Sequence, residues 1–122
     1  MKTVEIAEQL VELCRKGDHA KAKDLFYSPD IVSVEGMDMP HMPREMKGID
    51  AVRKKGEWWS ANHTIHGAKV TGPFVAVDKF AVLFDYDVTF KPTGERKKMT
   101  EVAVYTVGNG KIVHEEFLYI AA

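Results

Sequence analysis

The first quarter of the chain has the hydrophobic spacing of two amphipathic helices. In residues 3–16, apolar side chains recur at intervals of three and four, and charged side chains take the other side. Gly17 ends this helix, and Asp18 caps a shorter second helix that Pro29 brings to an end. The pattern therefore predicts a hairpin of two helices.

A β-rich run, a loop and a third helix follow. The residues from Ile31 to Glu35 favour a short strand. Residues 37–47 contain two prolines, four methionines and no regular period, which predicts a loop. Because methionine adapts to irregular apolar surfaces, this loop either covers a ligand cavity as a lid or plugs the edge of the core. A helical period resumes in residues 49–62.

The second half of the chain contains four β-rich runs separated by turn sequences. The runs are residues 63–70, 74–90, 95–107 and 111–120. The turns between them are predicted at residues 72–73, 91–94 and 108–110. This order predicts an antiparallel meander. Helices at the front and strands behind predict one α+β domain, residues 1–122, in which helices cover a curved sheet.

Length, composition and charge limit the class of protein. The 122 residues, of which 45% are hydrophobic and 29% charged, are typical of one globular domain. Seventeen Lys and Arg against eighteen Asp and Glu leave no basic excess for nucleic acid or an anionic membrane. No apolar run approaches the ~18–20 residues that span a bilayer, and no signal peptide is evident, so we expect a cytoplasmic protein. The single cysteine, Cys14, fits a reducing compartment and is interpreted as a core thiol.

Strand parity predicts which side chains share a face of the sheet. We expect the turn at Asn109 to pair Tyr105 with Val113, and alternate residues then point to one side. That face carries Met99, Glu101, Ala103, Tyr105, Glu115, Phe117 and Tyr119. A face that mixes aromatic rings with carboxylates is a poor dry core, so it predicts the wall of a pocket with polar groups at its base.

The neighbouring strand extends both faces. The expected register places Asp87 beside Met99 and Asp85 beside Glu101. The opposite face is mainly apolar and carries Phe84, Tyr86, Val88, Val102, Val104, Thr106, Ile112, His114, Glu116 and Leu118. Because the helices cover only one face of the sheet, we expect a second copy of the chain to cover this one and form a homodimer.

The order of elements and two sequence segments resemble a known family. The segments are Gly48 to Val52, which opens the third helix, and the ending from Glu101 to Tyr119, with its turn and strand at Gly110 to Val113. They resemble the SnoaL-like group of the nuclear transport factor 2-like superfamily, over nearly the whole chain. The resemblance implies a cone-shaped fold in which about three helices and a curved antiparallel sheet enclose an apolar cavity. Members of the superfamily include ketosteroid isomerases, polyketide cyclases, scytalone dehydratase and limonene epoxide hydrolase.

The family's functional residues are matched only in part. Ketosteroid isomerases have a general-base carboxylate at the end of the first strand and a second carboxylic acid before the last hairpin, and Glu35 and Glu101 lie at about those positions. In those enzymes the second acid works protonated, beside a tyrosine. The corresponding tyrosine of the first helix is missing here. Scytalone dehydratase has paired histidines and tyrosines around its cavity, and in this sequence only His66, Tyr105 and Tyr119 could contribute to such a set.

These observations predict acid/base chemistry on a small hydrophobic carbonyl compound, by a cofactor-free isomerase, cyclase or dehydratase. The candidate catalytic residues are Glu101, Asp87 and Glu35. Glu101 stands out because an unpaired carboxylate in an apolar strand tends to take up a proton. The candidate ligand-binding residues are Asp85, Tyr105, Phe117, Tyr119, His66, Trp59 and His41. The alternative is a noncatalytic domain that binds a small apolar ligand.

Other chemistries have no support in the sequence. It contains no P-loop, dinucleotide glycine motif or nucleophile elbow, so no nucleotide cofactor and no serine-type hydrolysis are predicted. His63 and His66 lack the spacing of a metal-binding pair, so no metal site is predicted. Asp85 and Asp87 alternate with apolar residues, a pattern equally typical of an exposed strand face.

Overall fold

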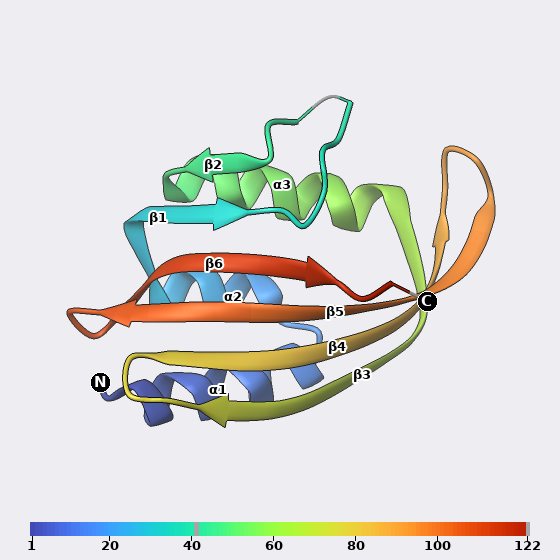
Figure 1. The fold of residues 1–122 in the computed structure, drawn as a ribbon. Coiled ribbons are helices and arrows are strands. Elements are labelled where there is room, and N and C mark those ends of the chain that lie inside the picture. Colours follow the sequence, from blue (N-terminus) through green and yellow to red (C-terminus); the bar gives the residue numbers. More distant parts are fainter. Residues whose placement is uncertain (41, 122) are drawn as a thin grey trace.

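The computed structural model describes residues 1–40 and 42–121, which form three helices and six strands (Figure 1). In chain order the elements are α1 (Thr3–Arg15), α2 (His19–Phe26), β1 (Tyr27–Val34), β2 (Glu45–Lys47), α3 (Ile49–Asn62), β3 (His63–Val75), β4 (Lys79–Phe90), β5 (Glu95–Gly108) and β6 (Lys111–Tyr119). The class is α+β, as predicted. Among the described residues, no helix is long and apolar enough to cross a membrane.

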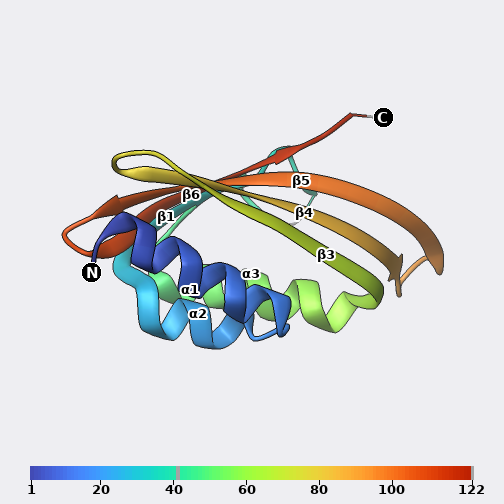
Figure 2. The same cartoon turned by 90° about the horizontal axis from the view of Figure 1, so that it is seen from below.

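All six strands belong to one sheet, in the order β2-β1-β6-β5-β4-β3. The four strands from β3 to β6 form the predicted antiparallel meander. The sheet as a whole is mixed, because β1 runs parallel to β6. The short strand β2, which lies inside the predicted loop, pairs with β1. The sheet is strongly curved, and all three helices lie on its concave side (Figure 2).

The predicted register between β5 and β6 is wrong by two residues. Tyr105 pairs with Glu115 and Glu101 with Tyr119. A shift of two keeps the side-chain parity, so the predicted face is retained for these residues. A bulge between Thr106 and Val107 changes the parity near the turn. It brings the Ile112 side chain into the core, where it is completely buried, so its predicted position on the outer face is wrong.

The predicted register between β4 and β5 is wrong by one residue, which reverses the face of every side chain in β4. Phe84 pairs with Glu101, and Asp85 pairs with Thr100. The four residues between Phe90 and Glu95 form the connection, and this loop length determines the register. Phe84, Tyr86 and Val88 therefore face the helices, whereas Asp85 and Asp87 lie on the outer face.

The predicted turn at Gly72 and Pro73 lies inside β3. The register of β3 against β4 shifts between Thr71 and Phe74 around these two residues. Gly72 has a φ of +124°, and proline donates no ladder hydrogen bond, so the pair forms a bulge. The chain reverses later, where the Ala76 amide donates to the Lys79 carbonyl over 2.7 Å.

The core lies between α1 and the inner face of the sheet. Its buried side chains include Ile6, Leu10, Val11, Ile31, Phe80, Val82, Phe84, Ala103 and Ile112. Cys14 is buried, as predicted for a core thiol. The loop methionines Met37, Met39, Met42 and Met46 are exposed or half-buried and belong neither to this cluster nor to the main pocket described below.

Gly36 allows the end of β1 to lie against β6. A Cβ atom at this position would lie 2.7 Å from the Phe117 carbonyl oxygen and 3.0 Å from the Tyr119 ring. Because a backbone atom has little room to move, we expect Gly36→Ala to lower the free energy of unfolding by about 2 kcal/mol, measured by urea denaturation. Gly67→Ala is the matched control, since its Cβ would meet nothing closer than 4.0 Å. Equal losses in the two variants would contradict this account.

Candidate functional site

A pocket of about 820 Å³ is lined by residues of the helices and of the sheet. All three helices contribute to its lining, and so do strands β1, β3, β4, β5 and β6. Its apolar and aromatic lining residues include Leu10, Val52, Trp59, Val70, Phe84, Tyr86, Tyr105 and Phe117. Where β1 approaches α3 and β6, several polar side chains form one connected network.

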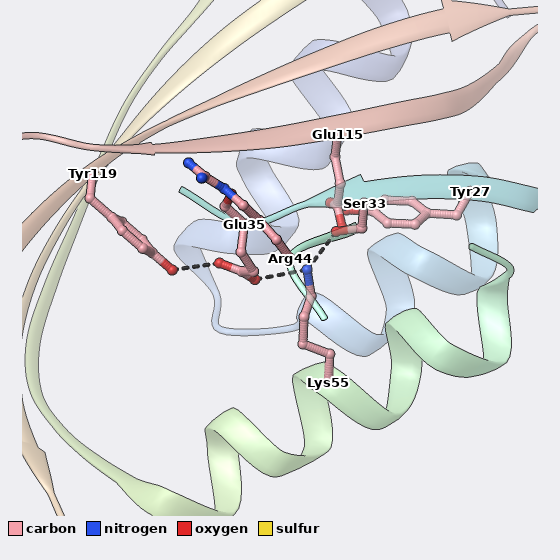
Figure 3. Close-up of polar contacts among 7 residues, drawn as sticks. All are labelled: Tyr27, Ser33, Glu35, Arg44, Lys55, Glu115 and Tyr119. Atoms are coloured by element: carbon pink, nitrogen blue, oxygen red, sulfur yellow. Dashed lines mark hydrogen bonds and ion pairs between the residues drawn. The ribbon is translucent and has the colours of Figure 1, made fainter. Parts of the chain in front are cut away.

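Lys55 of α3 lies at the centre of this network (Figure 3). Its ammonium group is 2.8 Å from Glu35 Oε1, and both side chains are only 10% exposed. The same Nζ atom donates a hydrogen bond to Ser33 Oγ over 2.5 Å. It also lies 5.1 Å from the centre of the Phe117 ring, at cation–π distance. Lys55 therefore joins α3 to the inner face of β1.

Two carboxylates complete the network, which we call the Lys55 network: Tyr27, Ser33, Glu35, Lys55, Glu115 and Tyr119. Ser33 donates to Glu115 Oε2 over 2.7 Å, and the Tyr27 hydroxyl donates to Glu115 Oε1. The Tyr119 hydroxyl donates to Glu35 Oε2 over 2.5 Å. Ser33 and Glu115 are both buried, and they are neighbours because β1 and β6 pair in parallel. Every carboxylate of the network thus accepts at least two donors.

Arg44 holds the end of β1 in place beside the network (Figure 3). Its side chain donates to the carbonyl oxygens of Glu35 and Gly36 over 3.0 and 2.8 Å. The Glu35 amide in turn donates to the Arg44 carbonyl over 2.8 Å. Glu35 is therefore fixed by its backbone as well as by its carboxylate.

Glu101 of β5 differs from these carboxylates. It lines the pocket opposite Tyr119, and its side chain makes no hydrogen bond or ion pair with any residue in the described ranges. The pKa of Glu101 is raised to about 7, first by burial and then by the negative charges of Glu35 and Glu115, whereas the positive charge of Lys55 acts in the opposite direction. Near neutral pH this carboxyl group exists in both protonation states, which suits a group that accepts and returns a proton.

Two tyrosines of the sheet present hydroxyl groups near Glu101. Tyr86 and Tyr105 line the pocket, and within residues 1–40 and 42–121 neither hydroxyl has a hydrogen-bond partner. Burial raises the pKa of both tyrosines, and the charge of Glu101 contributes to each shift. Both hydroxyls therefore remain protonated and able to donate a hydrogen bond to a bound molecule.

The structure brings together six of the sequence-predicted site residues. Glu35, Glu101, Tyr105, Phe117, Tyr119 and Trp59 all line the pocket. Trp59 stacks on His63, with ring centres 4.2 Å apart. His41 lies outside the described residues.

Three other predicted residues lie away from this pocket. Asp87 pairs with Arg96 through two hydrogen bonds of 3.1 and 3.0 Å, which lower the pKa of Asp87. Asp85 accepts a hydrogen bond from Thr100 over 2.7 Å. The predicted placement of both aspartates beside pocket residues is wrong because of the register of β4. His66 is exposed and lies 2.7 Å from the Thr89 hydroxyl.

Sequence reasoning named Trp59 and Glu35 but missed Lys55 of α3 and Ser33 of β1. Lys55 lies three residues after Val52 and four before Trp59, so the helical period alone indicated that these residues share one face. Ser33 alternates with Ile31 and Glu35 on β1, which also indicated a common side. No signal in the sequence indicated that this face of α3 meets this side of β1. Among the described residues, no group of three or more His, Cys, Asp or Glu side chains is placed to hold a metal ion.

Residues 1–119 match the SnoaL-like domain family, and the chain belongs to that family. The resemblance noted in the sequence is therefore confirmed, and it covers almost the whole chain. No curated protein matches the chain significantly.

Solved structures show the same fold. A Mesorhizobium loti protein provisionally named as a SnoaL-like polyketide cyclase is 46% identical, with a TM-score of 0.92, and the match covers 98% of this chain and all of that one. A nuclear transport factor 2-like protein from Burkholderia thailandensis is 21% identical, with a TM-score of 0.82 and coverage of 98% and 92%. A Bacillus subtilis protein provisionally named as an isomerase is 15% identical, with a TM-score of 0.72 and coverage of 97% and 86%. The last two similarities concern the fold alone.

Lys55 lowers the pKa of Glu101 through its positive charge. We expect Lys55→Met to raise this pKa above its value of about 7, because Glu35 and Glu115 then act on Glu101 without compensation. Carboxyl-carbon NMR across a pH series measures the change. Lys54→Met removes the same charge from an exposed position of α3 and should leave the pKa of Glu101 unchanged. An unchanged Glu101 titration in Lys55→Met would contradict the proximity of the two groups.

Proposed function

We propose that this protein is a cofactor-free acid/base catalyst that acts on a small hydrophobic carbonyl compound, in the manner of an isomerase, cyclase or dehydratase. The observation that carries the proposal is the Glu101 carboxyl group, which lines the pocket with no partner among the described residues and has a pKa of about 7. A group that is half ionised near neutral pH both removes and returns protons efficiently. The mixed aromatic and polar lining suits a small carbonyl compound.

In the proposed reaction, the Glu101 carboxylate removes a proton from the carbon next to the substrate carbonyl, and the electron pair moves to the carbonyl oxygen. The hydroxyl groups of Tyr86 and Tyr105 donate hydrogen bonds to the enolate oxygen that develops. Protonated Glu101 then returns the proton, to the same carbon or to another position, and the carboxylate is restored. The protein ends each cycle with the protons it began with.

The Lys55 network has a positioning role in this proposal. Its hydrogen bonds hold Glu35 and Glu115 in place, and their charges contribute to the raised pKa of Glu101. The network therefore adjusts the basicity of Glu101 without contacting the reacting atoms.

A noncatalytic domain that binds a small apolar ligand is the second candidate function. The aliphatic and aromatic part of the lining favours it, since residues such as Leu10, Val52 and Phe84 bind through apolar contact alone. In that case the pocket binds its ligand, and the protonation state of Glu101 has little effect on it.

Proton exchange at the α carbon of 2-tetralone, a small apolar ketone, tests which function is correct. In deuterated buffer, NMR should show that the protein accelerates exchange, with a rate that rises as the pH passes through about 7 because Glu101 acts as the base. We expect Glu101→Gln to lower this acceleration by about a hundredfold or more while the fold is kept.

Glu116→Gln is the matched control, because Glu116 is exposed and lies on the outer face of β6. The Glu116→Gln variant should accelerate proton exchange in 2-tetralone as much as the wild-type protein does. Binding of 2-tetralone without faster exchange would instead favour the ligand-binding function, and equal exchange in Glu101→Gln would remove Glu101 from the mechanism.

We also propose that the chain forms a homodimer through the outer face of the sheet. All three described helices lie on the other side of the sheet (Figure 2). Leu83, Val102, Val104 and Leu118 lie on it by register, and Leu118 is 45% exposed. Ile112, which the sequence placed here, is part of the core and does not contribute. A second copy of the same chain would bury this apolar area.

Sedimentation equilibrium should show a dimer at micromolar concentrations. We expect Leu118→Glu to raise the dissociation constant of the dimer by about tenfold or more, because it introduces a charge into the apolar interface. Leu25→Glu is the control, since Leu25 is a similarly exposed leucine on α2. A wild-type monomer at high micromolar concentration would exclude the dimer.

A further inference from the structure

Helix α2 presents two nitrogen-bearing side chains to the pocket. His19 and Lys23 lie one helical turn apart, both half-buried, and both line the pocket. Within residues 1–40 and 42–121, neither side chain makes a hydrogen bond or an ion pair. The His19 ring packs 6.4 Å from the Phe84 ring, centre to centre. This end of the pocket therefore has donors that no described protein group uses.

The other cations of the pocket have protein partners. Arg15 donates to the carbonyl oxygens of Val70 and Gly72, Arg53 pairs with Asp24 at 2.9 Å, and Lys55 pairs with Glu35. Glu115, the acid that acts most strongly on Lys23, already accepts hydrogen bonds from Ser33 and Tyr27. Lys23 is thus the one lysine or arginine of the described pocket lining that has no partner.

The ammonium group of Lys23 lies beside Gly56 of α3. A Cβ atom at position 56 would lie only 3.2 Å from Lys23 Nζ, so the absence of a side chain at Gly56 leaves space for the ammonium group. Burial lowers the pKa of Lys23, and Lys55 and Arg53 lower it further, whereas Glu115 and Cys14 act in the opposite direction. Burial also lowers the pKa of His19, so at neutral pH its ring is uncharged and carries one N–H donor. An unpaired ammonium in a half-buried position is unfavourable until an anion approaches it.

We propose that His19 and Lys23 form a subsite that binds the carboxylate group of the ligand. One ammonium and one neutral imidazole match a single negative charge, and the nearby acid Glu115 disfavours a dianion such as phosphate. Lys23 belongs to the helix layer and Glu101 to the sheet, on opposite walls of the pocket. Given the proposed function, on which this step rests, the substrate class is a small apolar keto acid, with its carboxylate at α2 and its carbonyl group toward Glu101.

The subsite is tested with 2-naphthoate and its neutral isostere 2-naphthamide. Isothermal titration calorimetry should give a dissociation constant about tenfold lower for naphthoate than for naphthamide in the wild-type protein, because a charge-assisted hydrogen bond is lost with the amide. We expect Lys23→Met and Lys23→Gln to remove this preference. Lys21→Met takes the same charge from an exposed position of α2 and should keep it. Circular dichroism establishes that each variant is folded.

Three outcomes would contradict the proposed carboxylate subsite. Equal affinity for the two compounds in the wild type, no binding of naphthoate, or a preference kept in a folded Lys23 variant would each exclude it. The result is independent of the proposed catalysis. Naphthoate has no enolisable carbon, so its binding does not depend on proton transfer to Glu101, and 2-tetralone has no anionic group, so its exchange in the wild type does not depend on Lys23.

Discussion

The ion pair between Lys55 and Glu35 is the interaction on which the site depends. The sheet brings three carboxylates into one pocket, because the end of β1 is followed by Glu35, and β5 and β6 contribute Glu101 and Glu115. Carboxylates at such close quarters are unfavourable unless a positive charge and hydrogen-bond donors compensate them. Lys55 supplies the positive charge, and three hydroxyl groups supply donors to Glu35 and Glu115. The contact between α3 and β1 is therefore electrostatic as well as apolar.

The carboxylates that have protein partners differ in role from the one that has none. Glu35 and Glu115 are fully engaged by the protein, whereas Glu101 is adjacent to them and has no partner among the described residues. Its raised pKa is a consequence of burial and of those two neighbouring charges. On the helix side, Lys23 also lacks a partner among the described residues. Glu115, the acid that acts most strongly on Lys23, already accepts hydrogen bonds from hydroxyl groups. Glu101 and Lys23, whose side chains have no partner among the described residues, are therefore available to bind a ligand.

Sequence reasoning reached the class of fold and the order of the main elements, because helical and strand periods are local properties of the chain. It also placed Glu101, Tyr105, Phe117 and Tyr119 on the correct side of the sheet, since an error of two residues in register keeps the parity. It failed for Asp85 and Asp87, where an error of one residue reverses the face. The short strand β2 was missed because its three residues carry too little pattern to distinguish them from a loop.

By itself, the sequence determined that Glu101 is an unusual residue, because a carboxylate in an apolar strand is costly to bury wherever that strand lies. The periods of α1, α3 and the meander were likewise determined by the local spacing of apolar residues. Only the tertiary structure decided that Lys55 meets Glu35 and Ser33, and that the Lys23 side chain has no partner in the part of the chain that the structure describes. These outcomes require the parallel pairing of β1 with β6 and the packing of α2 and α3 across the concave face. Such contacts join residues far apart in the chain, and their geometry depends on the curvature and register of the whole sheet rather than on any local pattern.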